Sequence, residues 1–319
     1  MDPPSEEAAP PGKRDGNVCP EMEGFFLERL PAVVSALQKE LPDGGYNLTN
    51  LSQMLMQLVQ FMEDVAGKNG MYKSQPKLPM KMFRDPGAFR APDGSIFALA
   101  ARIHQIKKMR NMVIDFGDVA RRREHLEIYL NCRRELEKLQ LLRHPRVFLD
   151  PSLSPTDISR MKEVLTKMGA SLADSADDSG ITHHVFPFPA SGDPDDGNIY
   201  LRVHEFRQSK ARVHWWYLPD SYDEYVSKEL VPDKLQPDVP PASGVWKVYP
   251  RWVWDSEKFN EWMNPTDYET NEAQEEQEKA AAAAKGAQLA QAKAAAATGG
   301  GGAAASGKRL HDGGVSGGV

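Results

Sequence analysis

The sequence predicts an α+β protein with a helical first half and a smaller second part of mixed strands and helices. Two observations carry this prediction. Apolar residues recur at helical spacing in long segments between residues 22 and 145. From residue 146 onwards, short apolar runs bounded by Pro, Gly and Asp alternate with single helical segments. We expect residues 1–21 and 271–319 to be disordered tails, because they are Pro-rich and acidic at one end and Ala/Gly-rich at the other.

The helical part is expected to span residues 22–145. Asn47 or Thr49 can cap its second helix, and Gly67 is a typical helix end. Residues 77–83 form a Pro-interrupted connector. The apolar stripes predict four helices, over residues 25–37, 51–65, 95–106 and 119–142.

The second part is expected to span residues 146–270. An apolar strand at 147–149 precedes a helix at 155–168, and a second apolar strand follows at 182–187. This strand–helix–strand order suggests that the two strands pair in parallel. The remaining elements are four strand-like segments and a final amphipathic helix, at 200–206, 212–217, 222–226, 246–249 and 252–263.

Composition limits the class of protein. Of the 319 residues 40% are hydrophobic and 26% are charged, as in a soluble protein with two domains and tails. The net charge of −6 argues against nonspecific nucleic-acid binding by the whole chain, but local basic faces remain open. The two cysteines, Cys19 and Cys132, are far apart and predict neither a disulfide framework nor a zinc site. The N-terminus has no signal-peptide pattern, and no apolar run is long enough to span a membrane.

Five aromatic residues gather in the segment VHWWYLPDSYDEYV, at residues 213–226. One interpretation is a cage that binds a methylated ammonium group by cation–π attraction. The other is the core of a small β module, which must fill its interior with large side chains. The residues by themselves favour the core, and both interpretations remain open.

A basic stretch covers residues 101–146, which contain twelve Lys and Arg against six Asp and Glu. One interpretation is contact with nucleic-acid phosphates. The other is a solvated helix face on which acidic and basic residues alternate. The candidate phosphate contacts are Lys107, Lys108, Arg121, Arg122 and Arg123.

We expect no enzyme. His183 and His184 are neighbours in a predicted strand, so their side chains point to opposite faces and cannot chelate one metal together. Phosphate-loop, nucleophile-elbow, zinc-protease and dinucleotide-binding motifs do not occur in the sequence. The expectation is therefore a chain with no catalytic residue, no cofactor, no metal site and no small-molecule substrate.

From Phe25 to Glu269 the chain resembles the N-terminal module of the core scaffold subunit of SWI/SNF chromatin remodellers, the Moira or SMARCC type. The segments that carry the resemblance are LSQMLMQLVQFMEDVAGK (51–68), KLPMKMF (77–83), PRVFLDPSLSPTDISRMKEVL (145–165), THHVFPFP (182–189), PDSYDEYV (219–226) and RWVWDSEKFNEWMNPTDYE (251–269).

The resemblance implies a particular architecture. Residues 22–145 would be a MarR-like helical domain, and residues 146–270 a BRCT-like domain. A chromo-like β module would be inserted in the latter at about 198–244. Trp252, followed by Asp255 and Ser256, matches the signature of the last BRCT helix.

The resemblance also implies a function. The chain would be a non-catalytic scaffold subunit, or an N-terminal fragment of one, in a nuclear chromatin-remodelling complex that regulates transcription. Its partners would be other subunits of that complex, with nucleosomal DNA or histones as further candidates. The alternative is a module that reads a histone tail or DNA directly. The SWIRM, SANT and coiled-coil regions of the family do not follow here, so a fragment, a truncated gene model or a short paralogue is expected.

Two positions bear on ligand binding. In the chromo-barrel pattern Trp215 and Tyr222 fall on positions that line the cage, whereas Leu218 stands where the pattern has Trp. BRCT domains that bind phosphopeptides have Ser or Thr and then Gly after the first strand, and this chain has Asp150 and Pro151 there. Trp215 and Tyr222 are therefore the candidate ligand-binding residues.

Overall fold

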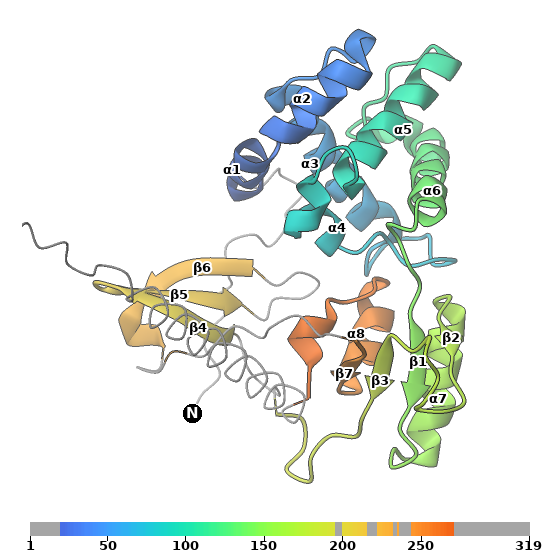
Figure 1. Cartoon of the computed structure of the whole chain (residues 1–319), viewed down its shortest axis with the longest axis vertical. Coiled ribbons are helices and arrows are strands. Elements are labelled where there is room, and N and C mark those ends of the chain that lie inside the picture. The colour runs from blue at the N-terminus through green and yellow to red at the C-terminus, as the bar shows by residue number, and fades with distance from the viewer. Residues whose placement is uncertain (1–19, 195–199, 216–221, 232–234, 236–243, 271–319) are drawn as a thin grey trace, which may run out of the picture.

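The computed structural model describes residues 20–194, 200–215, 222–231, 235 and 244–270. It confirms the α+β class, with helices in the first half and two small sheets in the second (Figure 1). Residues 1–19 and 271–319 of the predicted tails and parts of the predicted insertion lie outside these residues, whereas Pro20 and Glu21, predicted as tail, begin α1. None of the helices in the described part is long and apolar enough to cross a lipid bilayer.

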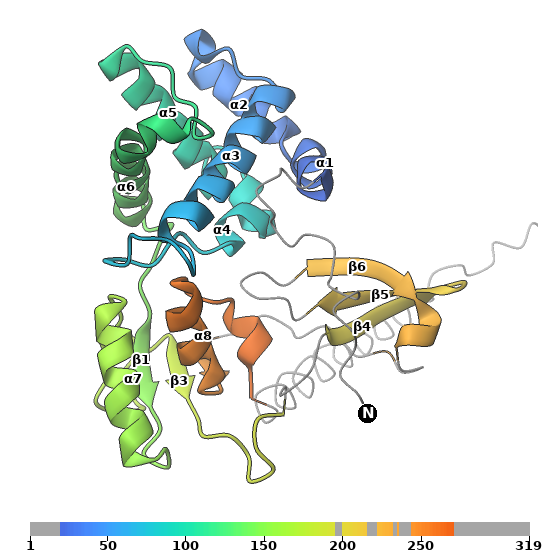
Figure 2. The ribbon, with the colours of Figure 1, turned by 180° about the vertical axis from the view of Figure 1, so that it is seen from behind.

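The helices of the first half share one hydrophobic cluster, which extends from Phe26 to Leu142. We call this part the helical unit, and Figures 1 and 2 show it at one end of the molecule. Its helices are α1 (Pro20–Arg29), α2 (Pro31–Glu40), α3 (Leu48–Ala66), α4 (Lys81–Arg84), α5 (Ser95–Arg110) and α6 (Arg122–Lys138).

The single helix predicted over residues 25–37 is wrong, because α1 and α2 are separate helices. Pro31 is the first residue of α2, where its missing N–H costs nothing and its fixed φ suits the first turn. Leu30 precedes it and is fully buried. The apolar spacing continues across this junction, so periodicity alone did not reveal the break.

Helix α3 shows how the sequence sets a local boundary. Asn47 caps it reciprocally with Asn50: the backbone N–H of each donates to the side-chain oxygen of the other, both at 2.9 Å. The predicted apolar stripe from Leu51 to Val65 faces the core, and all but Met54 of its members are buried. The helix crosses the middle of the helical unit, and its last turn points towards the second half of the chain (Figure 2).

The first sheet is parallel throughout, with strand order β2-β1-β3-β7. The expected parallel pairing of the strands around 147–149 and 182–187 is thus confirmed. The residue pattern gave no sign of the two-residue strand β2, because two residues show no periodicity. The elements are β1 (Arg146–Leu149), α7 (Pro155–Lys167), β2 (Ser171–Leu172), β3 (His183–Val185), β7 (Trp246–Val248) and α8 (Arg251–Phe259).

Helices α7 and α8 cover the same face of the parallel sheet. Val147 and Val185 point to this face and belong to one buried cluster with Met161 of α7 and Trp252 of α8. Phe148, between two such residues, points to the other face, where it packs with Ala173 and Ile181. We call the sheet and its two helices the parallel-sheet unit.

The second sheet is an antiparallel meander of β4 (Tyr200–Arg207), β5 (Lys210–Trp215) and β6 (Tyr222–Ser227). In the chain it lies between β3 and β7, which are neighbours in the first sheet. Its small core is formed by Val203, Ala211 and Val213. The ring of His214 lies 3.4 Å from the carboxylate of Asp267, which connects this sheet to the C-terminal end of the described chain.

Candidate functional site

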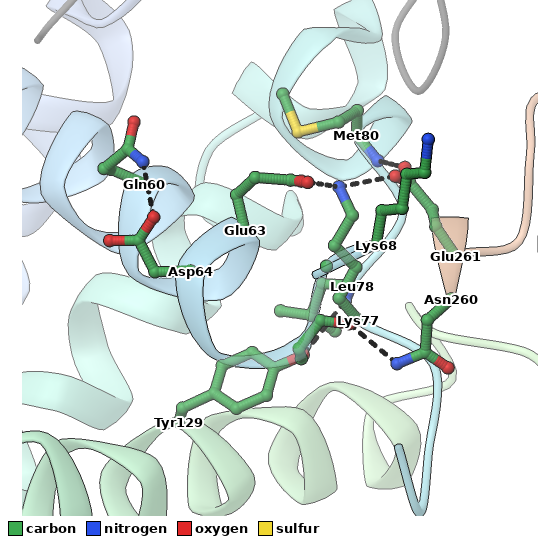
Figure 3. Close-up of polar contacts among 12 residues, drawn as sticks. Gln60, Glu63, Asp64, Lys68, Lys77, Leu78, Met80, Tyr129, Asn260 and Glu261 are labelled. Atoms are coloured by element: carbon green, nitrogen blue, oxygen red, sulfur yellow. Dashed lines mark hydrogen bonds and ion pairs between the residues drawn. The ribbon is translucent and has the colours of Figure 1, made fainter. Parts of the chain in front are cut away.

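A buried ion-pair cluster connects the helical unit to the parallel-sheet unit. At its centre is Lys77, in the connector between α3 and α4, with only 1% of its surface exposed. Its ammonium group lies 2.9 Å from a carboxylate oxygen of Glu63 in α3 and 2.6 Å from one of Glu261, just after α8 (Figure 3). Burying a lysine is costly unless it is paired, so the two carboxylates fix the connector in place.

Backbone hydrogen bonds reinforce the same junction. The N–H of Lys77 donates to the carbonyl oxygen of Asn260 at 2.7 Å, and Lys77 and Glu261 form a short parallel bridge. The N–H of Met80 donates to the Glu261 carboxylate at 2.7 Å, and that of Leu78 to the Tyr129 hydroxyl at 3.0 Å (Figure 3). These contacts leave the connector little freedom between the two units.

Asn260 supplies the third set of contacts. It ends α8 in the left-handed conformation, with φ of 51°, which asparagine tolerates better than most residues. The helix predicted to reach residue 263 therefore ends earlier, at Phe259. The Asn260 side-chain amide donates to the carbonyl oxygens of Ala66 at 2.7 Å and Gln75 at 3.2 Å. One residue thus binds the end of α3 and the connector at once.

Helix α6 closes the cluster from the other side. Arg133 is 2% exposed, donates to the carbonyl of Pro76, and lies 3.1 Å from the carboxylate of Glu137. Tyr129, which accepts from Leu78, is buried, and burial raises the pKa of its phenol. We call the contacts of Lys77, Glu63, Glu261, Asn260 and Arg133 the junction cluster.

Sequence reasoning missed the junction cluster. Its partners are separated by up to 194 positions along the chain, as for Ala66 and Asn260. The only local signal was the segment 77–83, which carries part of the family resemblance and places a lysine directly before an apolar residue and a proline.

The predicted phosphate-contact residues do not form one group. Lys108 lies 2.7 Å from Asp43, and this contact lowers the pKa of the Asp43 carboxyl. Arg122 lies 3.7 Å from Asp64. Asp43 precedes α3 and Asp64 belongs to its last turn, so the two acids lie at opposite ends of a helix whose intervening turns span roughly 25 Å.

The other basic candidates are exposed or paired. Arg121 lies 2.7 Å from Glu124, one turn further along α6. Lys107 and Arg123 are exposed. Lys107 and Lys108 also fall in the last turn of α5, where positive charge stabilises the helix end. These contacts agree with the interpretation of a solvated helix face, and contact with nucleic-acid phosphates stays a prediction.

The structure brings the backbones of Trp215 and Tyr222 together. They are direct partners in the antiparallel register of β5 and β6. Trp215 is half-buried and packs against the core of the three-stranded sheet. Leu218, the third position of the cage pattern, lies outside the described residues, as does the side chain of Tyr222. A methyl-lysine cage stays a prediction.

His183 and His184 face opposite sides of the parallel sheet. The His183 ring stacks on Trp252 with centroids 4.3 Å apart, and burial, helped by the charge of Lys81, lowers its pKa to about 3. His184 lies 3.0 Å from the carboxylate of Asp150 and packs against Phe148 on the other face. Burial lowers the pKa of His184 as well, and Asp150 opposes that shift.

Cys132 is the free cysteine in the described part of the chain. Cys132 is fully buried, and burial raises the pKa of its thiol to about 12, so the nucleophilic thiolate does not form at physiological pH. Within the described ranges, no group of three or more His, Cys, Asp and Glu residues is arranged to hold a metal ion.

Comparison with protein families finds a similarity for the helical unit. Residues 33–142, about a third of the chain, match the family described as the SWIRM-associated domain at the N-terminal. The match begins in α2 and ends just after α6, and it includes the connector with Lys77. Over these residues the chain is similar to this domain, which suggests a subunit of a chromatin-remodelling complex.

Proposed function

We propose that this chain is a non-catalytic scaffold subunit, or an N-terminal fragment of one, in a nuclear SWI/SNF-type chromatin-remodelling complex. The observation that carries the proposal is the match of residues 33–142 to the SWIRM-associated domain. Its partners would be other subunits of the complex, and its contribution would be to chromatin organisation and transcription regulation.

The arrangement of the second half supports the finer proposal of a BRCT-like unit with an inserted chromo-like module. The parallel order β2-β1-β3-β7, with α7 and α8 on one face, agrees with the order of elements that the resemblance implies. The antiparallel meander lies in the chain between β3 and β7, where the insertion is expected. A MarR-like helical domain is the corresponding proposal for α1–α6.

The junction cluster supports a scaffold role in a physical sense. A subunit that positions other proteins must hold its own units rigidly. If the units moved relative to each other, the proteins bound to them would also move relative to each other. The buried pairs of Lys77 with Glu63 and Glu261 restrict such motion.

The test is copurification of the tagged full chain from nuclear extract, with the same tag on an unrelated nuclear protein as control. We expect subunits of a remodelling complex, including its ATPase, to be enriched over the control. Failure to enrich any remodeller subunit would contradict the proposal.

The second candidate is a module that binds histone tails or DNA directly. The observation in its favour is the pairing of Trp215 with Tyr222 across β5 and β6. Trp215→Ala should then abolish binding of a methylated histone peptide without unfolding the chain. Peptide titration checks this, with circular dichroism as the control for folding. If the chain instead binds no peptide and binds duplex DNA only weakly, with an affinity that falls steeply as the salt concentration rises, that result would favour the scaffold role.

A further inference from the structure

A positively charged cavity lies where the helical unit meets α7 and α8. Its volume is about 250 Å³, and its charged lining consists of four lysines, Lys68, Lys73, Lys167 and Lys258, and one carboxylate, Glu257. Lys68 and Lys73 come from the segment after α3, whereas Lys167 and Lys258 belong to the last turns of α7 and α8. A molecule in this cavity would touch both units at once.

The four lysines influence one another in pairs. Those of Lys68 and Lys258 approach the same ring, Phe259, at 5.7 and 5.2 Å from its centroid. Lys73 donates to the carbonyl oxygens of Gly67 and Lys68, which anchors its side chain. Burial lowers the pKa of Lys73, Glu63 opposes that shift, and the charge of Lys167 adds to it, as expected for like charges facing a shared space.

The C-terminal ends of three helices offset only part of the positive charge of the four lysines. Helices α3, α7 and α8 all end at the cavity, and each C-terminus carries roughly half a negative charge. Together with Glu257 they balance fewer charges than the four lysines supply, which leaves an excess of about one to two positive charges. Arg160, 3.9 Å from Glu257, adds to the excess by compensating that carboxylate.

We propose that this cavity binds a small, multiply charged phosphoryl anion, and that the bound anion ties the helical unit to α7 and α8. Phosphoryl oxygens accept several charge-assisted hydrogen bonds, and a lysine acts on them as a point charge that needs no fixed geometry. The cavity is smaller than the typical site of a drug-sized ligand, which favours one or two phosphoryl groups. Free pyrophosphate and a phosphoryl group of a larger metabolite, such as an inositol polyphosphate, share this chemistry.

The test uses the full chain and a matched pair of double variants. Lys68→Ala with Lys258→Ala removes two exposed lysines from the cavity, whereas Lys39→Ala with Lys162→Ala removes two exposed lysines elsewhere. Pyrophosphate should raise the midpoint of thermal unfolding of the wild type and of the control pair. The variant with Lys68→Ala and Lys258→Ala, the cavity pair, should lose this shift. Calorimetry should show that its Kd for pyrophosphate is raised about tenfold or more.

Sodium sulfate at matched ionic strength separates specific binding from a general salt effect. The proposal is overturned if sulfate raises the midpoint as much as pyrophosphate, or if the cavity pair responds like the wild type. Should the cavity pair fail to fold, Lys68→Gln and Lys258→Gln are tested singly by the broadening of the ³¹P signal of pyrophosphate. Weaker broadening than with the wild type is expected, and equal broadening overturns the proposal.

Inositol hexakisphosphate distinguishes the two sources of the anion. If inositol hexakisphosphate binds more tightly than pyrophosphate, and the Lys68→Ala, Lys258→Ala variant loses this binding, the cavity takes a phosphoryl group of a larger metabolite. If pyrophosphate binds more tightly, the cavity takes the free anion. Anion binding is measured on the isolated chain, so a lack of binding would say nothing about membership of a remodelling complex. Failure of the copurification would likewise leave the cavity unaffected.

Discussion

Burial keeps His183 neutral at physiological pH, and this makes stability depend on pH. The folded-state pKa is about 3, against 6.5 for an ordinary histidine. Between these values the unfolded chain binds a proton that the folded chain does not. The stabilisation by the neutral ring is therefore fully present above pH 6.5 and is lost as the pH falls towards 3.

At the residue scale we predict that His183→Phe flattens this dependence while keeping an aromatic ring on Trp252. Between pH 7 and 4.5 the wild type should lose about 2–3 kcal/mol more of its free energy of unfolding than the variant. Urea denaturation of both proteins at several pH values measures the difference. Equal slopes in the two proteins would mean that another group governs the acid response.

At the scale of a single element, the connector between α3 and α4 depends on one buried charge. Lys77→Met keeps the length of the side chain but removes the ammonium group that lies between the carboxylates of Glu63 and Glu261. We expect the free energy of unfolding to fall by about 3–5 kcal/mol, because the buried carboxylate of Glu261 loses the cation that lies 2.6 Å from it.

Urea denaturation again supplies the measurement, with Lys39→Met as the control on an exposed lysine of α2. Adding Glu261→Gln to Lys77→Met should recover part of the loss, because one of the stranded charges disappears. A change of less than about 0.5 kcal/mol in Lys77→Met, the range usual for surface substitutions, would refute a structural role for the ion pairs.

At the scale of the whole molecule, the junction cluster should make the two units unfold together. All six tryptophans lie from Trp215 onwards, so their fluorescence reports the second half of the chain. Circular dichroism at 222 nm reports mainly the helical unit. In the wild type the two signals should change at the same urea concentration.

Combining Lys77→Met with Asn260→Gly should separate these transitions. The glycine keeps the left-handed backbone at residue 260 but removes the amide that binds Ala66 and Gln75. Coincident transitions in the double variant would show that the units are coupled by other contacts, such as those that line the lysine cavity.

Local patterns explain how much of the fold was predictable. The stripe from Leu51 to Val65, the cap at Asn47 and the alternating faces of β1 depend on neighbours within a few residues, and these appear directly in the sequence. The break at Pro31 was missed because the apolar spacing continues through it. The early end of α8 was missed because Asn260 adopts its left-handed conformation while binding a distant part of the chain.

The candidate sites were harder to predict because they depend on distant partners. Lys107, Lys108 and Arg121 to Arg123 appear as one basic stretch in the sequence. In the fold Lys108 lies beside Asp43 and Arg122 beside Asp64, at opposite ends of α3, whereas Arg121 lies beside Glu124. Lys68 and Lys258 showed no relation in the sequence, yet both approach Phe259.

The sequence by itself determined the α+β class, most of the helices and the parallel pairing of β1 with β3, and its segments carried the resemblance to remodeller scaffolds. These properties follow from periodicity and capping, which act over a few residues. Only the tertiary structure decided the junction around Lys77 and the lysine cavity. Both require charged residues that are far apart in the chain to lie side by side, and only the folded chain brings them together.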